Sequence, residues 1–183
     1  TEYSVNKEIE NTSRNERGEK RITIFQSKAY EAVIPKETTS LFDLGYSDIV
    51  WTEAKNGEEF NPKIQKTAQC HKSLEFMRRG MMKGKVDAFI CIGGMEGVEL
   101  EFDLFRELHP TKPIFILQST GGASKILAEK YSNLDVVKIL DRKDYSKIKT
   151  EKKEDNIDEK FDIIPYSFIT ALIVKQILDS KNN

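Results

Sequence analysis

Two short apolar segments, each running into a pair of glycines, constrain the fold of this chain more than any other feature. The first, over residues 86–90, is separated from Gly93-Gly94 by two residues, and a helical pattern follows. The second, over residues 113–117, is followed by Gly121-Gly122 and another helical run. Parallel strands joined by helices place both turns at one carboxyl edge of the sheet, where open α/β folds bind ligands. We therefore predict an α/β, Rossmann-like fold with a mainly parallel sheet flanked by helices.

Both glycine turns are suited to holding a phosphate. The N-terminus of a helix presents backbone N–H groups, and the helix dipole favours negative charge there. Glycine adopts positive φ and leaves room for the phosphate. Because an added carboxylate would repel the phosphate, Gly94→Asp is expected to abolish binding while the fold survives. The candidate ligand-binding residues are Gly93, Gly94, Met95, Glu96, Gly97 and Val98 in the first turn, and Ser119, Thr120, Gly121 and Gly122 in the second. The spacing matches neither Walker A nor G-x-G-x-x-G, so a tight turn without a ligand stays an alternative.

Composition limits the classes of protein that this chain can belong to. Its 183 residues, 38% of them hydrophobic, predict one domain over residues 1–183. The net charge of −1 excludes a global basic surface for nucleic acid. No apolar run approaches the roughly 20 residues that cross a bilayer. Two cysteines and a polar N-terminus without a signal peptide predict a cytoplasmic location, and the first residue, Thr1, leaves open an excised part of a longer protein.

Cys70-His71 is the pair that suggests a metal site or a nucleophile. The chain has one other histidine, His109, and the spacing of metal ligands is not met. We therefore predict neither a metal nor a cofactor.

The remaining sequence predicts further elements with weaker patterns. Strands are expected over residues 21–25, 30–34, 49–51 and 134–140, a helical turn over 41–44, and helices over 63–83 and from Pro165 onward. Residues 1–20 and 141–160 are dominated by polar and charged side chains and are predicted to be solvated loops. No clear strand–helix unit is evident in the first 62 residues.

Glu101 is a carboxylate that the helical pattern places at the first turn of the helix, on or beside its core-facing stripe. Positions 101, 104, 105 and 108 share one face of a helix, and the last three are Leu104, Phe105 and Leu108. A carboxylate on that face needs a partner, which Arg78 or the neighbouring Arg79 is able to supply.

Residues 74–130 carry motifs that are similar to those of a known superfamily. An Arg on a helix (Arg78), the run Asp87-Ala88-Phe89-Ile90 and the pattern Gly93-Gly94-x-x-Gly97-Val98-x-x-Glu101 resemble the motif block of the lonely guy phosphoribohydrolases. The turn over residues 119–123 resembles the second phosphate loop of nucleotide-sensing SLOG domains. The chain departs from the enzymes at Ile92, at Val98 and by one extra residue between Gly94 and Gly97.

The resemblance implies a function as well as a fold. The sensing branches imply a domain that binds a small NAD- or ATP-derived signalling nucleotide and regulates an attached or partner effector, as a homo-oligomer in bacterial defence. The enzymes imply the alternative, a phosphoribohydrolase that cleaves nucleoside 5′-monophosphates to base and ribose 5-phosphate, with Glu101 and Arg78 as catalytic residues. A structural Arg–Glu pair without a ligand, and a scaffold that uses the fold only to oligomerise, remain further alternatives.

Overall fold

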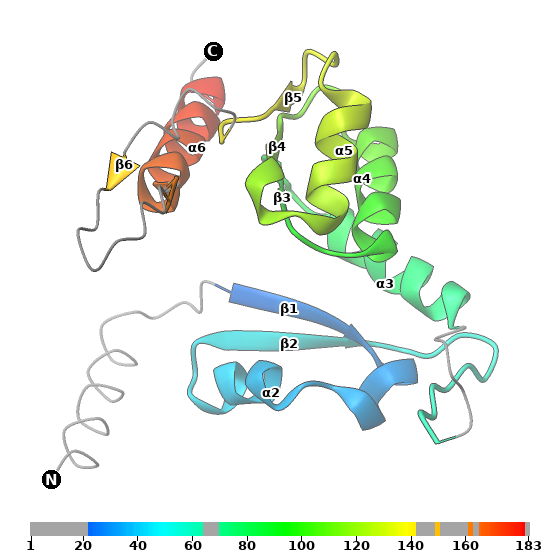
Figure 1. The fold of residues 1–183 in the computed structure, drawn as a ribbon. Coiled ribbons are helices and arrows are strands. Elements are labelled where there is room, and N and C mark those ends of the chain that lie inside the picture. Colours follow the sequence, from blue (N-terminus) through cyan, green and yellow to red (C-terminus); the bar gives the residue numbers. More distant parts are fainter. Residues whose placement is uncertain (1–21, 64–69, 142–148, 151–160, 163–164, 182–183) are drawn as a thin grey trace, which may run out of the picture. The chain divides into compact units, whose positions relative to one another are not determined.

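The structure is a computed structural model that describes residues 22–63, 70–141, 149–150, 161–162 and 165–181 (Figure 1). The chain divides into two compact units, Thr1–Gly84 and Lys85–Asn183. The loop predicted over residues 1–20, and most of the loop predicted over 141–160, lie outside the described residues. Within the described ranges, no helix is long and apolar enough to cross a membrane.

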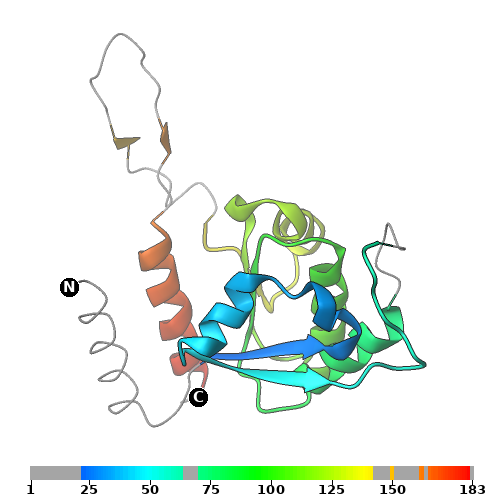
Figure 2. The ribbon, with the colours of Figure 1, turned by 90° about the horizontal axis from the view of Figure 1, so that it is seen from below.

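The first unit opens with two parallel strands, β1 (Ile22–Ser27) and β2 (Ser47–Thr52), paired from Ile22↔Ser47 to Ser27↔Thr52. A 3-10 helix, η1 (Lys28–Val33), and the helix α2 (Lys36–Asp43) connect them, as Figure 2 shows. The expectation that these residues contain no strand–helix unit is therefore wrong. Their connection makes them a β–helix–β unit, as an α/β fold requires.

The strand predicted over residues 30–34 is also wrong, because this segment lies largely in η1. Ser27 caps that helix, since its Oγ accepts a hydrogen bond from the N–H of Ala29 at 3.3 Å. Ala29 is buried, and the ring of Tyr30 stacks on Phe60 with centroids 5.3 Å apart. Local capping thus overrides the β propensity of the segment. The helical turn predicted over 41–44 is the end of the longer helix α2.

The helix α3 (His71–Met82) packs against both strands of the first unit. It begins later than the predicted residue 63, which lies in a turn, while residues 64–69 lie outside the described part. The carboxylate of Glu58 accepts the N–H groups of Lys72 at 3.3 Å and Ser73 at 2.8 Å. A side chain distant in the sequence therefore satisfies two of the N–H groups that have no partner within this helix.

The second unit contains a parallel sheet in the order β3-β4-β5, formed by β3 (Phe89–Ile92), β4 (Ile114–Leu117) and β5 (Val137–Lys138). The connecting helices are α4 (Glu96–Leu108) and α5 (Gly122–Tyr131), with the short 3-10 helix η2 (Gln118–Thr120) before α5. The antiparallel pair β6 (Lys149–Thr150) and β7 (Phe161–Asp162) and the helix α6 (Tyr166–Lys181) follow.

All four residues of β4 are buried, as is typical of a central strand covered on both faces. Phe115 and Leu117 pack with Ile169 and Ile173 of α6. On the other face, Cys91 of β3 contacts α5, since its Sγ lies 3.0 Å from the Oγ of Ser124. Helices therefore cover both faces of a parallel sheet, and the prediction of an α/β, Rossmann-like fold is confirmed.

Candidate functional site

The two glycine turns meet at the carboxyl ends of β3 and β4, as the sequence predicts. The strands end in register, with Ile92 opposite Leu117. The N–H of Gly93 donates to the Oγ1 of Thr120 at 2.6 Å, and the N–H of Ala123 donates to the carbonyl oxygen of Gly94 at 2.9 Å. Direct hydrogen bonds therefore join the two turns into one structure.

Four glycines give this structure its shape. Gly93, Gly94, Gly121 and Gly122 all have positive φ, of 60°, 91°, 73° and 55°. Gly121 combines its φ with a ψ of −162°, a region that only glycine adopts readily. A Cβ on Gly122 would lie 2.3 Å from the carbonyl oxygen of Gly94. The expected positive φ is confirmed, and the close approach of the two backbones is a second reason for glycine.

Val98 fills the space beside Gly94. A Cβ added to Gly94 would lie 2.4 Å from the Cγ2 of Val98, at a φ that already disfavours other residues. The side chain introduced by Gly94→Asp would have to displace Val98 at the start of α4, so we expect this variant to lose stability as well as binding. That its fold survives stays a prediction. Binding lost in that variant would not by itself identify a phosphate site.

The N-terminus of α5 is occupied by the first turn. Besides the bond from Ala123, the N–H of Ser124 donates to the carbonyl oxygen of Gly93 at 3.1 Å, as does its hydroxyl at 3.1 Å. The hydroxyl of Thr120 donates to the carbonyl oxygen of Leu117 at 2.5 Å, so its single hydrogen is already used. The second turn thus directs much of its donor capacity to the protein rather than to an anion.

The N-terminus of α4 has more capacity for an anion. Its first flanking residue, Met95, is extended, makes no side-chain capping bond and is 84% exposed. The N–H of Val98 donates to the carbonyl oxygen of Met95 at 2.8 Å. In the described part of the chain, no acceptor is found for the N–H groups of Glu96 and Gly97. These two groups are donors that a ligand oxygen is able to use.

Glu101 lies half-buried near the start of α4. Leu104 and Phe105 are buried as the helical spacing predicts, whereas Leu108 is 37% exposed. The Nε of Arg79 pairs with Glu75 at 3.0 Å. Arg78 belongs to the first unit and Glu101 to the second, so their contact stays a prediction.

Asp141 is a site residue that the sequence analysis missed. It is only 7% exposed, although it begins a segment predicted to be a solvated loop, and that prediction is wrong for this residue. Its carboxylate accepts the N–H of Gln118 at 3.0 Å and of Ser119 at 2.7 Å, and the hydroxyl of Ser119 also donates to it. Asp141 therefore fixes η2 and the entry to the second turn. The burial of such a residue is not evident from a charged stretch of sequence, because its hydrogen-bond partners come from another part of the chain.

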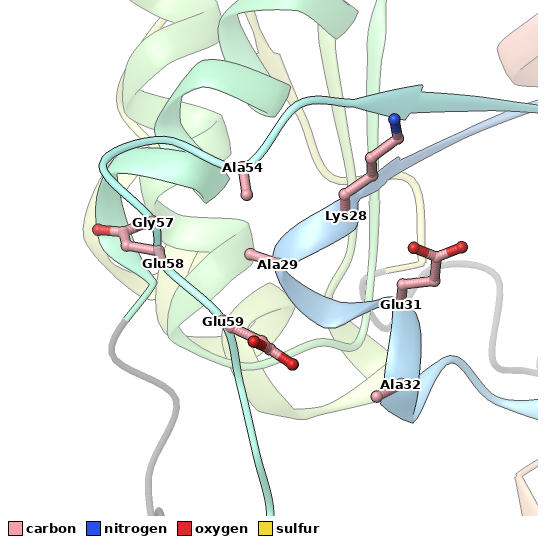
Figure 3. A pocket seen from close by; sticks show the side chains of 8 residues that line it. All are labelled: Lys28, Ala29, Glu31, Ala32, Ala54, Gly57, Glu58 and Glu59. Carbon is pink, nitrogen blue, oxygen red and sulfur yellow. The ribbon is translucent and has the colours of Figure 1, made fainter.

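A pocket of about 500 Å³ lies in the first unit, among residues that follow β1 and β2 (Figure 3). Its lining consists of Lys28, Ala29, Glu31, Ala32, Ala54, Gly57, Glu58 and Glu59. The Nζ of Lys28 pairs with Glu53 at 2.7 Å, and this hydrogen bond raises the pKa of the lysine. Hydrogen bonding with Ser73 lowers the pKa of Glu58. The carboxylates outnumber the single lysine, so the lining does not favour phosphate.

Cys70 and His71 stand at the start of α3, where Cys70 is buried and His71 is exposed. Among the described residues, no group of three or more His, Cys, Asp or Glu side chains is arranged to hold a metal ion.

Comparison with protein families places the chain in a known group. The model of the SLOG cluster3 family matches residues 8–152. The matched range contains both glycine turns, Glu101, Arg78 and Asp141. No curated protein and no solved structure matches the chain.

Proposed function

The chain belongs to the SLOG cluster3 family, and from that premise we propose that it senses a small NAD- or ATP-derived signalling nucleotide and regulates an attached or partner effector. Membership of this family suggests a nucleotide-related domain. The single observation that supports binding is the start of α4, where a helix without a side-chain cap follows a turn of two glycines. We propose one nucleotide-binding domain over residues 1–183, since the family match crosses the boundary between the two units at Gly84.

The phosphate binds at the start of α4 in this proposal. The N–H groups of Glu96 and Gly97 donate to its oxygens, and Gly93 and Gly94 leave no side chain in the way. Each hydrogen bond to a charged group contributes about 1.5–3 kcal/mol, and the helix dipole adds about 0.3–1 kcal/mol. Glu96 and Glu99 lie in the same first turn, and their repulsion favours a phosphate of low charge, such as a diester or an internal diphosphate.

The rest of the proposed site surrounds that phosphate. Glu101 accepts hydrogen bonds from ribose hydroxyls, and the second turn closes the opposite side. The proposed ligand-binding residues are Arg78, Gly93, Gly94, Met95, Glu96, Gly97, Val98, Glu101, Ser119, Thr120, Gly121 and Gly122.

Sensing is favoured over hydrolysis by the environment of Val98. The matching position of the phosphoribohydrolase motif is Thr, whose hydroxyl is suited to hold a phosphate oxygen, whereas Val98 packs on Gly94. The half-buried Glu101 supports hydrolysis as the second candidate, with Glu101 and Arg78 as the catalytic residues. The resemblance to sensing domains supports a role in bacterial defence and a homo-oligomer. Two buried free cysteines, Cys70 and Cys91, suit the cytoplasm.

A thermal-shift screen of the whole chain tests the proposal. AMP, ADP, ADP-ribose and NAD are added one at a time, with adenosine as the control that lacks a phosphate. A ligand at 100 times its Kd stabilises the folded state by about 2.7 kcal/mol. We expect at least one phosphate-bearing compound to raise the melting temperature more than adenosine does. Equal shifts with adenosine would refute the phosphate site, and steady release of free base from AMP would favour the hydrolase.

A further inference from the structure

A chain of hydrogen bonds connects the second turn to the first residue of α6. At its buried end, the carboxylate of Asp141 accepts two backbone N–H groups and the hydroxyl of Ser119. At its exposed end, the Oγ of Ser119 lies 3.0 Å from the phenol oxygen of Tyr166. Tyr166 is 42% exposed. The chain therefore leads from a buried charge to the surface.

The donors and acceptors of this chain have one consistent direction. An ionised carboxylate only accepts hydrogen bonds, so the single hydrogen of the Ser119 hydroxyl points to Asp141. Ser119 then accepts from Tyr166, which uses the hydrogen of the phenol. The phenol oxygen keeps only its capacity to accept. Its next partner must donate a hydrogen, and an ionised phosphate oxygen has none to give.

The phenol of Tyr166 is held close to the glycine turns. Ile169 and Ile173 anchor α6 on β4, since both are buried against Phe115 and Leu117. Ser119 is followed directly by Thr120, whose Oγ1 accepts the N–H of Gly93. An acceptor at the start of α6 therefore lies beside the edge at which the phosphate site is proposed.

We propose that Tyr166 is a ligand-binding residue that accepts a hydrogen bond from a hydroxyl of the ribose. This subsite rests on the proposed function and divides the ligand between two places. The phosphate takes the N–H donors at the start of α4, and the sugar takes the acceptor at Tyr166. The buried charge of Asp141 supports this division in two ways. It repels a phosphate, and it polarises the hydroxyls of Ser119 and Tyr166 so that the phenol oxygen becomes a better hydrogen-bond acceptor.

Calorimetric titration of the full chain with AMP and with 2′,3′-dideoxy-AMP tests the subsite. The two probes share base and phosphate and differ only in the ribose hydroxyls. The wild type should bind AMP more tightly, because Tyr166 and Glu101 are both proposed to accept hydrogen bonds from ribose hydroxyls. Tyr166→Phe keeps the ring and removes one acceptor, so its preference for AMP should be about 2- to 10-fold smaller than that of the wild type, as expected for one hydrogen bond. Tyr46→Phe is the matched control, because Tyr46 is 44% exposed and belongs to the first unit, and it should keep the wild-type preference.

The outcomes separate this inference from the function on which it rests. A wild type that binds both probes equally, or a Tyr166→Phe variant that keeps the full wild-type preference for AMP, overturns the subsite while phosphate binding stands. A wild type that binds neither probe overturns the subsite, and it overturns the proposed function as well only if ADP, ADP-ribose and NAD also fail to bind. Melting curves that coincide for the wild type and Tyr166→Phe, without ligand, show that the variant is folded.

Discussion

Replacing Met95 by Asp should make the protein more stable and its nucleotide binding weaker. Met95 precedes α4 in an extended conformation and offers no polar atom to cap the helix. Asp is among the best residues at this position, because its carboxylate accepts an N–H two or three residues later. That same carboxylate would stand where the phosphate is proposed to bind. The substitution is therefore expected to raise the stability of the folded state and to lower the affinity for the nucleotide.

The magnitudes follow from the exposure of this helix start. A new cap contributes about 0.5–2 kcal/mol, typically near 1 kcal/mol, and such a gain raises the melting temperature of a chain of this size by about 2–4 °C. Two like charges about 4 Å apart repel by about 1 kcal/mol in bulk water and about 4 kcal/mol near a protein surface. Met95 is 84% exposed, so we take the lower part of this range and expect a loss of affinity of about 10-fold.

Scanning calorimetry and titration with the tightest nucleotide of the screen measure both effects. Met95→Leu is the neutral control and should change neither property. Met95→Asn adds a cap without a charge, so it should raise the melting temperature and weaken binding less than Asp does. Damage to the fold would lower stability and affinity together. A Met95→Asp variant that is more stable but binds the nucleotide as tightly as the wild type would refute the phosphate site at α4.

Three further predictions follow from the described contacts. Gly94→Ala should destabilise the chain by about 1–3 kcal/mol in urea denaturation through strain and overpacking, and Val98→Ala should restore part of that loss; no rescue would contradict the packing of these two residues. Because the pKa of Glu58 is lowered from 4.5 in the folded state, its contribution to stability is present above that value and is lost as pH falls through the lowered pKa. Glu58→Gln should therefore lose less stability than the wild type between about pH 5 and pH 3 in denaturation measured as a function of pH. Curves of stability against pH that run parallel for the two proteins would argue against this linkage. Glu101→Ala should change nucleotide affinity in a sensor, with no free base released by the wild type. If chromatography shows base release that stops in this variant while binding persists, the hydrolase is the better assignment.

The sequence predicted those parts of the structure that depend on local order. The strand–glycine–helix pattern is visible within about fifteen residues, so β4, α4 and the adjacent turns were predictable. Their positive φ followed from the need for tight turns after parallel strands. The expected positions of Leu104 and Phe105 in the core followed from helical spacing alone.

The parts of the structure that the sequence did not predict depend on contacts between residues that are distant in the sequence. The start of α3 is set by Glu58, fifteen residues before Ser73, and hydropathy carries no sign of that contact. Asp141 lies 22 residues from Ser119, in a charged run that resembles many solvated loops. The carbonyl oxygens of Gly93 and Gly94 accept N–H groups at the start of α5. These hydrogen bonds join two separate turns, so neither turn predicts them alone.

The contact between Gly94 and Gly122 bears on how a protein of this kind is able to change its ligand. Any side chain at Gly122 would strike the backbone of Gly94, so the second turn does not accept a larger residue at this position without rearranging the first. The contact between these glycines therefore fixes the geometry of the two turns, here called the glycine frame, and we do not expect single substitutions within it to change the ligand preference easily. New selectivity is more accessible at the rim, where Met95 and Tyr166 are exposed and their replacement leaves the glycine frame intact. A library for altered nucleotide preference is best built at those two positions.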